Sequence, residues 1–79
     1  MAKARLTLTA GLLVKGQAKS LLEKVKREVL WSEPDAHVVI NEDWGLLESE
    51  FEIQITHISD TMALALQGTF RTLAEQLED

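Results

Sequence analysis

The chain contains no cysteine, so neither a disulfide framework nor a thiolate metal site is available to it. It also lacks any run of about 18 apolar residues, the length needed to cross a membrane, and its N-terminal segment lacks the apolar stretch of a signal peptide. Internal repeats and low-complexity tracts are absent too. We therefore expect one small cytoplasmic domain over residues 1–79, whose marginal stability would benefit from association with a partner.

Glycine and proline are scarce, with four glycines and one proline, and two long segments have the apolar spacing of amphipathic helices. The first should end near Trp31, because Pro34 cannot continue a helix. The second can be capped by Ser59 or Asp60. Their apolar stripes are Ala18, Leu21, Leu22, Val25 and Val29 in the first and Met62, Leu66, Phe70, Leu73 and Leu77 in the second.

Three other segments, residues 5–10, 36–41 and 48–55, alternate apolar and polar side chains as strands with one buried face do. The polar and glycine residues of 41–45 have the composition of a connection, so the last two strands should form a hairpin. Residues 11–16 could either extend the first strand past a bulge or lead into the first helix, and the sequence leaves both open.

The order strand, helix, strand, strand, helix predicts an α+β fold. We expect a two-layer sandwich with a three-stranded antiparallel or mixed sheet and both helices on one face. A right-handed crossover would make the first two strands parallel, with the third antiparallel to its hairpin partner. If the third strand is central, the open face of the sheet sets basic and hydroxyl side chains beside carboxylates. These are Arg5, Thr7 and Thr9 on one strand and Glu48, Glu50 and Glu52 on the other.

Charge is segregated along the chain, which has a net charge of −5. Residues 1–27 hold seven of the eight basic side chains and one carboxylate, whereas residues 28–79 hold Arg71 and twelve carboxylates. Such segregation indicates either partners or pairing between parts of the same chain. Lys15, Lys19, Lys26 and Arg27 could form a nucleic-acid-binding band, but the acidic total and the lack of aromatic residues among them favour a solvated helix face. Strong direct nucleic-acid binding is therefore not expected.

No group of residues has the pattern of a catalytic, cofactor or metal site. His37 and His57 could act as bases or ligands, but no second histidine or cysteine stands at ligand spacing along the chain, which favours solvated surface histidines. The carboxylates of 48–52 fit a solvated strand face better than a cation site. The serines lack a nucleophile elbow, and no glycine-rich phosphate loop is present. We expect a protein that is not an enzyme and needs no cofactor or metal.

Five residues are candidates for an interface with a protein partner. Trp31 and Trp44 lie at a helix end and in a loop, where each could either cover the core or anchor a partner. Leu64 faces away from the apolar stripe of the last helix, with Ala65 alongside and Gly68 one turn on. A mid-helix glycine costs about 1 kcal/mol relative to alanine and often allows a second backbone to approach. The alternative is one exposed leucine and one tolerated glycine.

The segment Ile58-Ser59-Asp60-Thr61-Met62-Ala63-Leu64 opens the last helix, and its Asp60-Thr61 with Leu64 resembles the small dimer-forming subunit of KEOPS. KEOPS is the complex that makes threonylcarbamoyladenosine in tRNA. The resemblance extends to the element order over most of the chain, and it implies a non-catalytic subunit that pairs with itself or a paralogue and docks onto a catalytic partner. That family usually has an arginine where this chain has Ala65, so no role of that position is carried over.

Two classes of function follow. The first is an adaptor that dimerises, with itself or a paralogue, and joins a larger assembly. The second is an acidic inhibitor or regulator that blocks a basic groove by imitating nucleic acid. Its carboxylate surface would comprise Glu42, Asp43, Glu48, Glu50 and Glu52.

Overall fold

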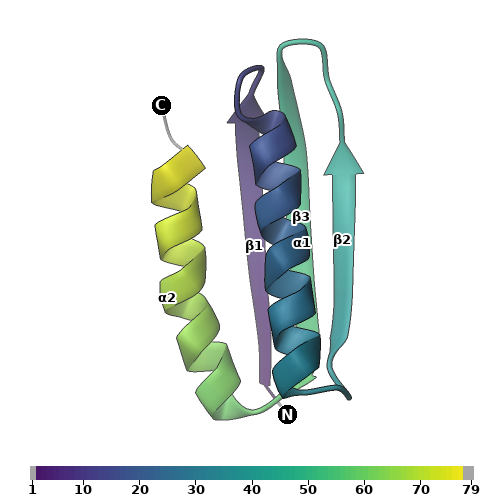
Figure 1. Ribbon diagram of the computed structural model, residues 1–79, viewed down its shortest axis with the longest axis vertical. Helices are drawn as coiled ribbons and strands as arrows, with labels where there is room; N and C mark the ends of the chain where they lie inside the picture. The colour runs from purple at the N-terminus through teal and green to yellow at the C-terminus, as the bar shows by residue number, and fades with distance from the viewer. Residues whose placement is uncertain (1, 78–79) are drawn as a thin grey trace.

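The computed structural model describes residues 2–77, which form a three-stranded antiparallel sheet and two helices in the order β-α-β-β-α (Figure 1). The elements are β1 (Ala2–Gly11), α1 (Lys15–Ser32), β2 (His37–Asp43), β3 (Glu48–Ile58) and α2 (Asp60–Leu77). The strand order is β1-β3-β2, so β3 is central and antiparallel to both neighbours, while β1 and β2 are parallel edge strands. The predicted α+β fold is confirmed.

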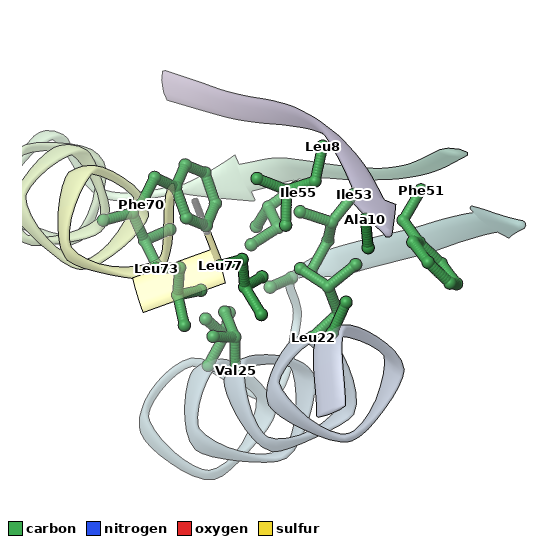
Figure 2. Packing of buried hydrophobic residues seen from close by; sticks show 14 of the residues in the cluster. Leu8, Ala10, Leu22, Val25, Phe51, Ile53, Ile55, Phe70, Leu73 and Leu77 are labelled. Atoms are coloured by element: carbon green, nitrogen blue, oxygen red, sulfur yellow. The ribbon is translucent and has the colours of Figure 1, made fainter. Parts of the chain in front are cut away.

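The core lies between the sheet and the helices, where α1 packs against β1 and β3, and α2 packs against β1. Side chains of α1 and α2 converge on those of the sheet in Figure 2. The fully enclosed apolar residues of β3 are Phe51, Ile53, Ile55 and Ile58. Burying each such side chain contributes about 1.5–3 kcal/mol, so the alternation of β3 supplies the centre of the fold.

Strand β2 lies beyond the area that the helices cover (Figure 1). Its helix-side residues Val38 and Ile40 are only half-buried, and Val39 on the opposite face is 51% exposed. Strand β1 is different in its second half, where the helix-side residues Leu8 and Ala10 belong to the buried core, although Ala4 and Leu6 before them are half-buried. The sheet is therefore packed on the β1 side and open on the β2 side.

The structure resolves the question that residues 11–16 leave open in the sequence. Strand β1 ends at Gly11, whose carbonyl oxygen accepts a hydrogen bond from the Val14 amide at 3.1 Å, and α1 begins at Lys15. The segment is thus a tight turn into the helix. Residues 41–43, predicted as part of a connection, instead continue β2, because they pair with 50–52 of β3. The connection proper is residues 44–47.

Ser59 caps α2, as the sequence predicts. Its hydroxyl oxygen accepts a hydrogen bond from the Met62 amide at 3.1 Å. The Glu33 carboxylate, just after α1, accepts hydrogen bonds of 2.8 Å from both the amide and the hydroxyl of Ser59. This contact joins the end of α1 to the start of α2 and satisfies polar groups that a helix terminus otherwise leaves free.

Candidate interaction surfaces

The five predicted interface residues lie in two separate places. Trp31 near the end of α1 is 88% exposed, and Leu64 near the start of α2 is 67% exposed. Ala65 and Gly68 are exposed on α2 nearby. Trp44 lies in the β2–β3 connection at the opposite end of the molecule, the upper end in Figure 1. The structure therefore does not bring the five residues into one surface.

A hollow of about 200 Å³ separates the two helices on the side away from the sheet, and Ala65 is part of its lining. The apolar members of this lining are Val25, Val29, Met62, Ala65 and Leu66. Gly68 lies further along α2, and a methyl group added there would meet no atom within 4 Å. Packing within the chain therefore gives no reason for a glycine at position 68.

Trp44 is a half-covered residue at the end of the core. Its ring meets the buried Phe51 ring edge-on, with 5.2 Å between the centroids. Its indole nitrogen donates a 2.9 Å hydrogen bond to Glu42. The Lys15 and Lys19 ammonium groups lie 5.7 and 6.0 Å from the ring centroid, which is within the range of cation–π attraction. These contacts make Trp44 a link between the core and the polar groups around it.

Four exposed leucines that sequence analysis missed lie in the β1–α1 and β2–β3 connections, the second of which also holds Trp44. Leu13 and Leu46 are more than nine-tenths exposed, at 95% and 92%, and Leu12 and Leu47 are also exposed. We call Leu12, Leu13, Trp44, Leu46 and Leu47 the apolar tip. The signal in the sequence is a triplet that occurs twice, Gly-Leu-Leu at 11–13 and at 45–47, each at the point where strand alternation stops.

Polar contacts join the first turns of α1, just after the β1–α1 loop, to the β2–β3 hairpin. The Lys15 ammonium group donates a 3.1 Å hydrogen bond to the Gly45 carbonyl oxygen, and Lys19 forms a 3.2 Å ion pair with Glu42. Hydrogen bonds from Trp44 and Lys19 hold the pKa of Glu42 below its ordinary value. The Gly45 amide also donates to the Ser49 hydroxyl at 3.2 Å. Lys15 and Lys19 thus each have a polar partner within the chain.

The open face of the sheet pairs opposite charges, as the sequence predicts for a central β3. Thr7 and Thr9 lie opposite Glu52 and Glu50, and the Arg5 guanidinium forms an ion pair with Glu52. Hydrogen bonds from Arg5, and then from Gln54 and Asn41, hold the pKa of Glu52 below its ordinary value. The net negative charge of this surface is therefore smaller than the sequence alone indicates, since the ionised carboxylates of Glu42 and Glu52 pair with Lys19 and Arg5.

His37 and His57 lie side by side at the end of the sheet opposite the apolar tip. Their ring centroids are 4.2 Å apart, with 30° between the ring planes. Both are exposed, as predicted for solvated surface histidines. Their proximity was not predicted, because the sequence analysis considered spacing along the chain and not strand pairing. Residues 37 and 56 are register partners in the hairpin, which places residue 57 beside 37. Counting outward from the hairpin connection would have found the pair.

Comparison with protein-family models, curated proteins and solved structures finds no match for this chain. Neither α1 nor α2 is long and apolar enough to span a membrane. Within residues 2–77, no three histidine or carboxylate side chains are grouped closely enough to hold a metal ion.

Proposed function

We propose that this protein is a non-catalytic interaction subunit, which pairs with another copy of itself or a paralogue and joins a larger assembly. The observation that carries the proposal is the apolar tip. Four leucines from two loops lie exposed on one side of a small domain, and exposed apolar groups of this extent typically mark sites of protein association.

The polar contacts beneath the apolar tip support a binding role. Lys15 and Lys19 fix the positions of the two loops through Gly45 and Glu42. A surface that is ordered before binding loses less conformational entropy on association. Each leucine that becomes fully buried would contribute about 1.5–3 kcal/mol. These contributions would also add to the modest stability of so small a core.

Sedimentation velocity at tens of micromolar tests the proposal. We expect the wild-type chain to sediment as a dimer, or to form a complex with a paralogue recovered by affinity purification. The double variant Leu13→Ser, Leu46→Ser should remain folded and monomeric, because both side chains are exposed in the free chain. Leu64→Ser on α2 removes an exposed leucine outside the apolar tip, so it tests separately whether the outer face of α2 contributes to the contact. A wild-type chain that is monomeric and recovers no partner contradicts the proposal.

The outer face of α2 is a second candidate contact, and its two open glycines allow a matched test. Gly16 in α1 and Gly68 in α2 both have open space where a methyl group would be added. Each change to alanine should therefore stabilise the free chain by up to about 1 kcal/mol. If a second backbone approaches α2, Gly68→Ala weakens association and Gly16→Ala does not. Equal association by both variants would remove Gly68 from the interface.

Within this class of function, the resemblance of Asp60-Thr61 with Leu64 supports an accessory subunit of a complex that makes threonylcarbamoyladenosine in tRNA. The side of α1 and α2 that faces away from the sheet, with the hollow between the helices, would be available for docking onto a catalytic subunit. Deleting the gene should lower the threonylcarbamoyladenosine content of tRNA, measured by mass spectrometry of tRNA nucleosides. Normal content in the deletion strain, with no catalytic subunit co-purifying, would reject this assignment.

One observation favours the alternative of an acidic inhibitor. Asp43 lies directly opposite Glu50, an arrangement of like charges that destabilises a sheet, and no salt bridge in the described chain involves either residue. A basic groove of another protein would relieve this repulsion. Glu50→Lys should then abolish binding to a partner that nucleic acid also displaces. Unchanged binding by Glu50→Lys would reject nucleic-acid mimicry.

A further inference from the structure

We infer that His37 and His57 form a binding site for a divalent first-row transition-metal ion, with Zn²⁺ as the representative case. Imidazole nitrogen is a preferred ligand of Zn²⁺, Cu²⁺ and Ni²⁺, whereas Mg²⁺ and Ca²⁺ prefer oxygen. The two rings come from β2 and β3 and are both solvent-exposed, so an ion can reach them directly.

The spacing of the two rings fits chelation. Two imidazole nitrogens that bind one Zn²⁺ at about 2.0–2.1 Å are about 3.3 Å apart in a tetrahedral site. The ring centroids here are 4.2 Å apart with the planes inclined by 30°. Rotation about the terminal side-chain bonds, which exposed rings undergo freely, can bring one nitrogen of each ring to that separation.

The backbone at His57 holds its ring in this position. His57 has a φ of 61°, and no other non-glycine residue in 2–77 has a positive φ. Lys3 pairs with Thr56 and Ala2 with Ile58, so His57 is the extra residue of a β-bulge at this end of β3. Left-handed backbone in a residue with a side chain costs free energy, and such positions occur often at binding sites.

The hydroxyl of Thr56 is a hydrogen-bond partner of the His57 ring. The Thr56 oxygen lies 3.1 Å from Nδ1 of His57. In the tautomer with the proton on Nδ1, the Nδ1–H group donates a hydrogen bond to the Thr56 oxygen, and the lone pair of Nε2 remains free for a metal ion. A neighbour that orients a metal-binding histidine in this way is a usual part of such sites.

The electrostatic surroundings favour a cation. His57 borders an open hollow of about 490 Å³ that is also lined by three carboxylates, Glu33, Asp35 and Asp60. The Glu33 oxygens are engaged by Ser59, whereas none of the hydrogen bonds or ion pairs of the described side chains involves Asp35 or Asp60. No lysine or arginine lines this hollow, and Lys3 lies opposite Thr56 on the β1 side.

The site supplies two protein ligands. Since no group of three ligand side chains exists within residues 2–77, Asp35 and Asp60 act on the ion through their field and not by coordination. Water completes the coordination shell, and at least one position remains open to a ligand from another molecule. The site lies at the opposite end of the sheet from the apolar tip, so it does not depend on the proposed function.

Calorimetric titration of the untagged full-length chain with ZnCl₂ tests the inference. We expect saturable binding of one Zn²⁺ per chain and no heat of binding with MgCl₂. In NMR spectra, the ring nitrogen signals of both histidines should shift as Zn²⁺ is added. No saturable binding of Zn²⁺, or binding that leaves both ring signals unchanged, overturns the inference.

Two single variants separate imidazole binding from binding by the carboxylates. His57→Gly removes the ring and relieves the positive φ, so it should fold at least as well as the wild type. His37→Gln alters an exposed residue at the start of β2. Each should weaken Zn²⁺ binding by about tenfold or more. Zn²⁺ should raise the unfolding temperature of the wild type and have little effect on either variant.

Asp43→Asn is a matched control, because it removes one charge at the far end of β2. Its Zn²⁺ affinity should equal that of the wild type within about twofold. If His57→Gly and His37→Gln also bind as the wild type does, the carboxylates are the ligands and the inference fails.

Discussion

The two edge strands share one central partner but differ in how the rest of the chain covers them. Strand β1 lies beneath both helices, and its Leu8 and Ala10 are buried. Strand β2 pairs with the same β3, yet Val38 and Ile40 stay half-buried because neither helix extends across them. Hydrogen bonding to β3 therefore does not by itself bury the apolar side chains of an edge strand. The β2 side carries most of the candidate contact groups: the hairpin leucines, the adjacent histidines and Asp43.

The largest expected effect comes from truncating the helix-side residue of each edge strand. Leu8→Ala in β1 should lower the free energy of unfolding by about 2–4 kcal/mol, because it leaves a cavity beneath the helices. Ile40→Ala in β2 should cost about 1–2 kcal/mol, since the side chain is only half-buried in the monomer. Urea unfolding of both variants at low protein concentration measures the difference. Equal losses would show that β2 is covered as well as β1.

A smaller effect is expected at the connection that leads out of β2. A methyl group at Gly45 would collide with the carbonyl oxygen of Glu48, so Gly45→Ala must distort the hairpin. We expect a loss of about 1–3 kcal/mol in the free energy of unfolding. The loops of the apolar tip should also loosen, which hydrogen exchange at residues 44–47 would detect. Unchanged exchange there would mean that the hairpin adapts without strain.

The segment before β2 is tied to α2 through Glu33, and this contact gives the next prediction. Glu33→Ala leaves the amide and hydroxyl of Ser59 without their carboxylate partner. The free energy of unfolding should fall by about 1–2 kcal/mol. Ser59→Ala removes the helix cap as well and should cost about 1 kcal/mol. If the double variant loses the full sum of the two single losses, the two residues act independently and the contact adds nothing.

The smallest effect concerns acid. The pKa of Glu52 is lowered chiefly by Arg5 of β1, with a contribution from Asn41 of β2. A lowered pKa adds stability that is present above the ordinary value of about 4.5 and is lost as the pH falls through the folded-state value. Stability should therefore decline below about pH 4.5. Arg5→Gln should decline less steeply than Asn41→Ala in urea unfolding between pH 5 and 3, values chosen as roughly bracketing a carboxylate titration. The reverse order would place the stronger coupling on the β2 side.

Sequence patterns predict the fold because every buried stripe has a clear period. The strict alternation of 48–55 and the helical spacing of Leu66, Phe70, Leu73 and Leu77 leave few other arrangements. The pairing of Arg5 with Glu52 followed once β3 was placed in the centre. The periodicity of the sequence does not reveal the adjacent histidines or the apolar tip, since each is formed by residues of different elements that meet only in the folded chain. The sequence leaves Trp44 between two interpretations, because the contact of its ring with Phe51 depends on how β2 and β3 pair in space.

The central position of β3 also determines when the sheet can form. Strand β1 is made first, but its partner β3 ends at Ile58, which pairs with Ala2 at the other end of the described chain. No strand of the sheet has a neighbour until residues 48–58 have been synthesised, and the local β2–β3 hairpin can then close before β1 is added. Folding on the ribosome must therefore keep the apolar face of β1 and the stripe of α1 soluble until most of the chain has been synthesised, and truncations before residue 48 should have no stable sheet.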